Sequence, residues 1–206
     1  MRISHTIRTL ITSDFLINSG FSVFAPVFAV FVTRQISNAT IQTVGFAAAI
    51  TQIVKALLQI PVAQYLDRNH GEYDDFYAMV LGSSLVVLVP VCYLWVHTAN
   101  QVYLTQALYG VGLALAVPPW YAIFTRHIDA EQENIEWSLE SVGIGISGAG
   151  AAALSGIVVS AYGFHAVFIL AAVFAAAGTA MQIKIYRDLR RHVGHREVEP
   201  KPDKIV

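Results

Sequence analysis

Residues 76–125 decide the fold of this chain: FYAMVLGSSLVVLVPVCYLWVHTANQVYLTQALYGVGLALAVPPWYAIFT. This stretch of 50 residues contains no Asp, Glu, Lys or Arg. About 20 apolar residues, each adding about 1.5 Å to a helix, cross a hydrocarbon layer about 30 Å thick. The stretch is too long for one such helix and is interrupted by a polar turn, HTANQ, at residues 97–101. It therefore predicts two membrane-spanning helices joined by a short loop.

The same pattern continues along the chain. Residues 15–33 carry no charge, residues 35–66 carry only Lys55, and residues 141–183 carry none. The last of these stretches is divided near Gly163, which predicts a helix stop. The expected fold is all-α, a polytopic membrane protein with six transmembrane helices. The spans are expected at about 9–33, 42–66, 75–96, 101–125, 138–160 and 164–186, in one domain over residues 1–186 that is followed by a polar cytoplasmic tail at 187–206.

The composition excludes several classes of protein. Of the 206 residues, 55% are hydrophobic and 13% are charged, whereas soluble domains carry roughly 25% charged residues. The chain has one cysteine, Cys92, so no disulfide framework is expected. A nucleic-acid binder, a secreted disulfide scaffold and an ordinary cytosolic enzyme are all excluded on these grounds.

The distribution of Lys and Arg predicts the orientation in the membrane, because these residues are retained on the cytoplasmic side of short loops. Six spans place both termini on one side. That side carries eleven basic residues, and the opposite side carries only Arg34. We therefore expect a cell membrane protein, plasma or inner, with its N- and C-termini in the cytoplasm. The eleven are Arg2, Arg8, Arg68, Arg126, Lys184, Arg187, Arg190, Arg191, Arg196, Lys201 and Lys204.

Matched prolines suggest an internal repeat. Pro26 lies late in the first span and Pro118 late in the fourth, and the residues twelve positions earlier, Asp14 and Gln106, are both polar. Secondary transporters are often built from inverted three-helix repeats whose interrupted helices flank the substrate. The pattern predicts a 3+3 inverted repeat with Asp14 and Gln106 in a cavity. Coincidence with ordinary membrane-helix prolines is the alternative.

Two charges are predicted to lie within the membrane. Asp14, with Asn18 one helical turn further on, has two interpretations: a cavity carboxylate that binds a cation or exchanges a proton, or a helix cap formed with Ser13 at the headgroups. Lys55 lies near the middle of the second span, so it faces protein or water. It could pair with Asp14, bind an anionic group of a substrate, or form a purely structural ion pair.

The fifth span carries small residues four positions apart: Gly148, Ala152, Gly156 and Ser160. Such a stripe permits close approach of another helix. We expect Gly148, Ala152 and Gly156 to form a helix-packing interface.

Three segments resemble signatures of the major facilitator superfamily. Residues 63–72, AQYLDRNHGE, resemble its G-x-x-x-D-R-x-G-R-K loop, with Asp67 and Arg68 in place. Residues 106–112, QALYGVG, resemble R-x-x-x-G-x-G with Gln106 in place of arginine, and residues 163–168, GFHAVF, are similar to G-W-R-x-x-F. The resemblance spans about residues 10–186 and implies one six-helix half of the superfamily's twelve-helix fold.

The resemblance implies a transporter that works by alternating access. Asp67 and Arg68 would form a cytoplasmic conformational latch, and Gln106 in place of arginine weakens the case for proton coupling. One half alone would leave a cavity wall facing lipid, so we expect either a homodimer or an excised N-terminal half. In the homodimer the Gly148, Ala152 and Gly156 stripe would meet the second span of the partner.

The predicted function is secondary transport of a small solute, with or without a coupling ion, through a cavity that contains Asp14, Asn18, Lys55 and Gln106. The alternative is a non-transporting membrane module that binds a partner protein. It would use the fifth span and the acidic residues Asp129, Glu131, Glu133, Glu136 and Glu140. No catalytic residues, metal ligands or cofactor are predicted, so no enzyme is expected, and the expected partners are the lipid bilayer, a small molecule and a second copy.

Overall fold

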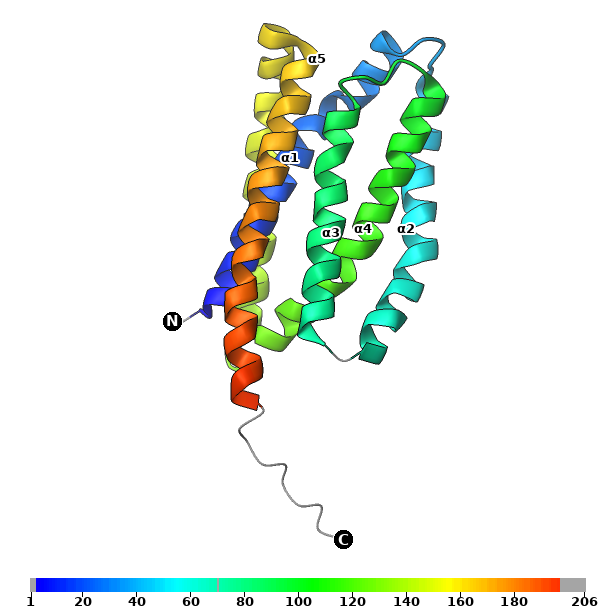
Figure 1. The fold of residues 1–206 in the computed structure, drawn as a ribbon. Helices are drawn as coiled ribbons and strands as arrows, with labels where there is room; N and C mark the ends of the chain where they lie inside the picture. The colour runs from blue at the N-terminus through cyan, green and yellow to red at the C-terminus, as the bar shows by residue number, and fades with distance from the viewer. Residues whose placement is uncertain (1–2, 70, 197–206) are drawn as a thin grey trace.

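The computed structural model describes residues 3–69 and 71–196 as an all-helical bundle (Figure 1). Its helices are α1 (His5–Gln35), α2 (Ile41–Asn69), α3 (Glu72–Cys92), α4 (Ala99–His127) and α5 (Glu133–Arg196). Each is long and apolar enough to cross a membrane. The predictions of an all-α fold and a multi-pass membrane protein are therefore confirmed.

The number of helices differs from the six predicted, because the last two expected spans are assigned together as α5. This helix contains one residue with non-helical dihedral angles, Gly163, at φ 78° and ψ 179°. A positive φ of this size favours glycine, which has no Cβ to clash with the backbone. The chain reverses direction at the top of α5, so its two arms run side by side (Figure 1). The predicted boundary between spans five and six thus coincides with the break inside α5.

Local capping explains where two of the helices begin. The backbone N–H of Ile7 donates to the Ser4 hydroxyl over 3.2 Å at the start of α1. At α4, Thr98 and Gln101 form a reciprocal capping box. Because α1 begins at His5, Asp14 lies nine residues inside the helix, and the interpretation of Asp14 as a helix cap is wrong.

The last helix extends into the predicted tail. The backbone of α5 continues to Arg196, so the first half of the tail at 187–206 is helical. Residues 197–206, like residues 1–2 and 70, lie outside the described part of the chain.

Two helix pairs are held together by glycines that let the backbones approach closely. A Cβ at Gly20 would lie 2.6 Å from the carbonyl oxygen of Ala171, and one at Gly178 would lie 2.6 Å from that of Ser13, so α1 packs tightly on α5. On the other side, a Cβ at Gly82 of α3 would lie 2.6 Å from the carbonyl oxygen of Gly112 in α4. These contacts define an α1–α5 pair and an α3–α4 pair, and α2 packs mainly on α4.

Two apolar clusters fill the bundle at different heights. One gathers aromatic rings of α1, α3 and α5, including Phe31, Tyr93 and Phe168. The other lies toward the end of the bundle where the termini are, around Ile7, Met79 and Phe124. The membrane provides no water to drive helices together, so this packing and the close backbone contacts supply the cohesion.

We expect Gly82→Ala to destabilise the bundle, because the new Cβ would lie 2.5 Å from the backbone nitrogen of Ala116 and would force α3 away from α4. Gly150→Ala is the matched control: nothing lies within 4 Å of a Cβ there, and replacing glycine in a helix stabilises it by about 0.5–1 kcal/mol. Thermal unfolding in detergent, followed by circular dichroism, should show a lower midpoint for the first variant only. Equal midpoints would contradict the tight α3–α4 contact.

Candidate functional site

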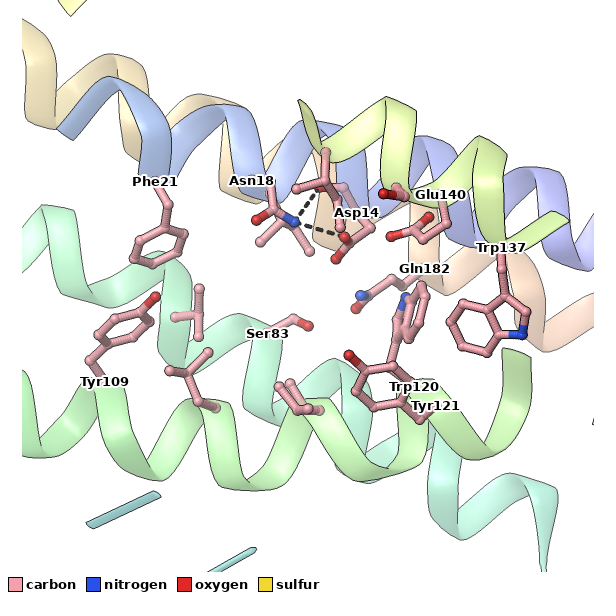
Figure 2. Close-up of a pocket in the computed structure, with 17 residues that line it drawn as sticks. Asp14, Asn18, Phe21, Ser83, Tyr109, Trp120, Tyr121, Trp137, Glu140 and Gln182 are labelled. Carbon is pink, nitrogen blue, oxygen red and sulfur yellow. Dashed lines mark hydrogen bonds between the residues drawn. The ribbon is translucent and has the colours of Figure 1, made fainter. Parts of the chain in front are cut away.

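A cavity of about 470 Å³ lies between the α1–α5 pair and the α3–α4 pair (Figure 2). This is within the range of about 300–1,000 Å³ that is usual for sites that bind small molecules. Most of its wall is apolar. The lining residues are Asp14, Ile17, Asn18, Phe21, Ser83, Val86, Tyr109, Leu113, Ala116, Val117, Trp120, Tyr121, Trp137, Glu140, Ser141, Ile144 and Gln182.

The acidic part of the cavity joins α1 to α5. The side-chain amide of Asn18 donates to the Asp14 carboxylate over 2.7 Å and to the Asp14 carbonyl oxygen over 3.1 Å. The carboxyl of Glu140 faces Asp14 within hydrogen-bonding range. Glu140 is 5% exposed, and with both groups ionised neither of its oxygens has a donor. A hydrogen bond between the two acids therefore requires a proton on one of them; with both ionised, a cation between them would be needed to hold them together.

Two further buried polar groups lack partners in the cavity wall. Neither the side-chain oxygen of Gln182 nor the indole N–H of Trp120 has a hydrogen-bond partner within the described structure. Buried polar atoms are nearly always paired, so unpaired ones that line a cavity are available to a ligand or to water. The site thus offers an unpaired acceptor at Gln182 and an unpaired donor at Trp120 on a mainly apolar surface.

Aromatic rings lie at both ends of the cavity (Figure 2). At one end Phe21 of α1 stacks on Tyr109 of α4, with ring centroids 4.6 Å apart and planes 8° apart. At the other end Trp137 lies 4.5 Å from Phe124 and 6.1 Å from Tyr121, measured between ring centroids. Each end of the cavity is thereby narrowed by rings from different helices.

Two of the four predicted cavity residues, Asp14 and Asn18, line this cavity, whereas Gln106 and Lys55 do not. Gln106 is buried in a joint between α4 and α2. Its amide oxygen and backbone carbonyl oxygen both accept from the Thr51 hydroxyl, and its amide nitrogen donates to the Tyr93 hydroxyl over 3.0 Å. The polar atoms of Gln106 therefore form hydrogen bonds within the bundle instead of facing the cavity.

Lys55 is half-buried on α2, and over residues 3–69 and 71–196 it has no ion-pair partner. The pairing of Lys55 with Asp14, one of the three alternatives for this residue, is not formed. The ammonium group of Lys55 thus lies on α2, a helix that is largely exposed on the outside of the bundle.

The predicted latch residues lie beside an ion pair that sequence inspection missed. Arg126 of α4 contacts Asp75 of α3, with 2.5 Å between guanidinium nitrogen and carboxylate oxygen. Asp67 is close enough for its negative charge to act on Asp75, while Arg68 is exposed. From the sequence, Arg126 contributed only to the predicted orientation of the chain in the membrane. Its spacing from Asp75 gives no sign of the contact, because the two residues lie on different helices.

The predicted packing stripe is only partly used within the chain. Gly148 lies near the Ser22 side chain, with 3.6 Å from a Cβ built at Gly148 to the hydroxyl oxygen, but nothing lies within 4 Å at Gly156. The buried face of this arm is offset by one residue and is formed by Ser147, Ala151 and Ser155. Within the stripe, Gly156 thus remains open to another helix, while Gly148 and Ala152 are half-buried.

Several residues of the site could not be identified beforehand. Glu140 was assigned only to an acidic segment, although it lies one turn after Glu136, which is itself fully buried and accepts from the backbone N–H of Asp129. Trp120 and Trp137 resemble ordinary interfacial aromatics, and Gln182 lies at the end of a long apolar run. The spacing of Glu136 and Glu140 on one helical face was the one available signal.

Five apolar helices, four of which line a cavity with buried carboxyl groups, define a multi-pass membrane protein. Residues 10–205 match the family model of the Major Facilitator Superfamily. The chain therefore belongs to the Major Facilitator Superfamily, whose members are secondary transporters of small molecules and not enzymes, and the predicted family is confirmed. No curated protein matches the chain significantly.

We expect Arg126→Gln to destabilise the protein by about 1–3 kcal/mol, because Asp75 would be left buried without its counter-charge. The cost is below that of breaking a fully buried pair because the Arg126 side chain is 37% exposed. Arg34→Gln, at an exposed position, is the control. Unfolding midpoints in detergent measure the difference, and adding Asp75→Asn to the first variant should restore part of the loss. A midpoint equal to that of Arg34→Gln would show that the pair contributes nothing.

Proposed function

We propose that this protein moves a small solute across the membrane by alternating access, and that the cavity between the two helix pairs is its binding site. The observation that carries the proposal is the facing pair of carboxyls, Asp14 and Glu140, inside an apolar bundle. Burying such groups is costly unless they bind something. A proton or another cation at this pair would couple ion movement to solute movement.

We propose further that the chain crosses the membrane six times, as a 3+3 inverted repeat with both termini in the cytoplasm. The described apolar part of α5, Glu133–Tyr186, has 54 residues and would extend about 80 Å if straight. A hydrocarbon layer of about 30 Å accommodates it only as two passes. The reversal at Gly163 supports this reading (Figure 1).

Alternating access requires that each end of the cavity can be closed. The stacked rings of Phe21 and Tyr109 would close one end, and the rings around Trp137 would close the other. On the side of the termini, Asp67 and Arg68 would act with the Asp75–Arg126 pair as the latch of one state. Breaking these contacts in turn would open the cavity to one side at a time.

A homodimer of six-helix halves completes the proposal. In the dimer, α2 of one copy would pack on the first arm of α5 of the other, where the stripe with Gly156 is open. It would also remove Lys55 from lipid, which the single chain leaves without a counter-charge. Lys55 would then border the space between the two copies, whereas Gln106 stays in the joint between α4 and α2.

The alternative function, a module that binds a partner protein through its acidic segment, has less support. Of the five acidic residues it depends on, Glu136 and Glu140 are buried inside the bundle. They are therefore unavailable to a partner in this conformation.

The transport proposal can be tested by counterflow in proteoliposomes with three radiolabelled solutes: tetraphenylphosphonium, benzoate and glucose. We expect uptake of at least one of them, and Asp14→Asn should reduce it by about tenfold or more, because a charge-assisted contact in the cavity is lost. Glu131→Gln, which removes an exposed carboxylate outside the cavity, should leave uptake unchanged. Absence of counterflow for all three solutes, or unchanged uptake by Asp14→Asn, would contradict the proposal.

The dimer can be tested by light scattering of the purified protein and by single-molecule photobleaching in liposomes. We expect a dimer that Gly156→Leu dissociates, because a large side chain blocks close approach at the open stripe. Gly150→Leu is the control, since it adds the same bulk to another face of the same arm with nothing within 4 Å. A monomeric wild-type protein, or equal effects of the two leucines, would exclude this interface.

A further inference from the structure

The charge of the cavity wall determines whether the cavity binds a cation or an anion. Its lining contains two acids, Asp14 and Glu140, and no Lys, Arg or His. Arg126, which lies at this end of the bundle outside the cavity, is already paired with Asp75. With one proton shared between Asp14 and Glu140, the pair still carries one negative charge, and no basic side chain in the cavity wall compensates it. An anionic ligand would be repelled there, and a cation would be stabilised.

The surroundings of the two acids favour an organic cation over a metal ion. Calcium takes about 6–8 oxygen ligands, and magnesium an octahedron of them. Within the described residues no group of three or more His, Cys, Asp or Glu side chains is placed to hold a metal. The amide nitrogen of Asn18 faces Asp14, so that side chain already serves as a donor to the acid.

Aromatic rings flank the acids. Trp120, Tyr121 and Trp137 lie next to Glu140 and Gln182, and Trp120 and Tyr121 meet edge to face with ring centroids 5.2 Å apart (Figure 2). The face of an aromatic ring attracts a cation, tryptophan most strongly, by about 2 kcal/mol when water is excluded. A carboxyl pair beside such rings suits a large, weakly hydrated cation.

The remainder of the wall fits an apolar body attached to that charge. The lining also includes aliphatic side chains, among them Val86, Leu113 and Val117. A molecule that fills about 470 Å³ would bury its apolar surface there while its charged group lies at Asp14 and Glu140. Gln182 and Trp120 offer unpaired polar atoms to any further polar group on the ligand.

We infer that the cavity binds a monovalent organic cation with an aromatic or bulky apolar body, with its charge held between Asp14, Glu140 and the rings of Trp120 and Trp137. This inference rests on the proposed role of the cavity as the binding site. It assigns the class of solute, which the family membership leaves open.

The test uses two probes of the same shape and opposite charge, tetraphenylphosphonium and tetraphenylborate, with purified full-length protein in detergent. Equilibrium dialysis should show tetraphenylphosphonium binding at least about tenfold more tightly than tetraphenylborate, since the acids attract one and repel the other. Glu140→Gln should lower the affinity for tetraphenylphosphonium by about tenfold or more, and Asp14→Asn should do the same. Glu131→Gln should leave the affinity unchanged.

The contribution of the rings is measured with Trp137→Leu, which should weaken binding by about three- to tenfold. Trp95→Leu is its control, because Trp95 is 65% exposed and lies outside the cavity. Circular dichroism and gel filtration establish that each variant is folded, and Glu140→Gln provides the decisive comparison if Asp14→Asn does not fold.

Equal affinity for the two probes, or unchanged affinity in Glu140→Gln, would overturn the inference. Because binding is measured without transport, the two proposals fail separately. Binding of tetraphenylphosphonium with no counterflow would contradict the transport proposal alone. Counterflow of benzoate or glucose, without binding of tetraphenylphosphonium, would contradict the ligand class alone.

Discussion

Carboxyl groups buried between apolar helices are the constraint on which the rest of this structure depends. Each must be compensated, because neither lipid nor the packed bundle supplies water. Asp75 is compensated by Arg126, so that site is closed and joins α3 to α4. Asp14 receives one amide donor from Asn18 and otherwise faces a second acid, Glu140. The second arrangement leaves an unfilled demand for positive charge, and it lines a cavity of about 470 Å³.

The cavity follows from the way the helices are paired. Glycine contacts bring α1 against α5 and α3 against α4 at distances that exclude side chains. Every lining residue belongs to one of these two pairs, and α2 contributes none. The pairs meet through bulky rings at the two ends of the cavity, where Phe21 stacks on Tyr109 and Phe124 contacts Trp137. Tyr93 at the end of α3 also packs against Phe31 of α1 and Phe168 of α5. The alternating access proposed above would require one helix pair to tilt against the other across these contacts.

The amino-acid sequence predicts the helices well because charge is excluded from them, and the break at Gly163 because a polar turn interrupts an apolar run. It also predicts Asp14 and Asn18 as a local pair, since four residues separate them on one helix. Glu140 and Arg126 are different. Their roles depend on which helix packs opposite them, and nothing in the sequence specifies which helices pack together. The polar character of Gln106 suggested that it lines the cavity. The sequence could not show that Thr51 and Tyr93 already occupy its hydrogen-bonding groups.

The contrast between Asp14 and Gln106 indicates how matched positions can acquire different tasks. Both are polar residues twelve positions before a proline, but the partners around them differ. Gln106 has each side-chain group satisfied, and a fully satisfied buried network fixes one geometry. It therefore joins α4 to α2. Asp14 faces a second acid, Glu140, so the most stable distance between the two carboxyls depends on whether a proton or a cation lies between them. In the proposed mechanism, Gln106 would be a fixed joint on one side of the bundle, and the Asp14–Glu140 pair a contact that responds to a bound cation on the other.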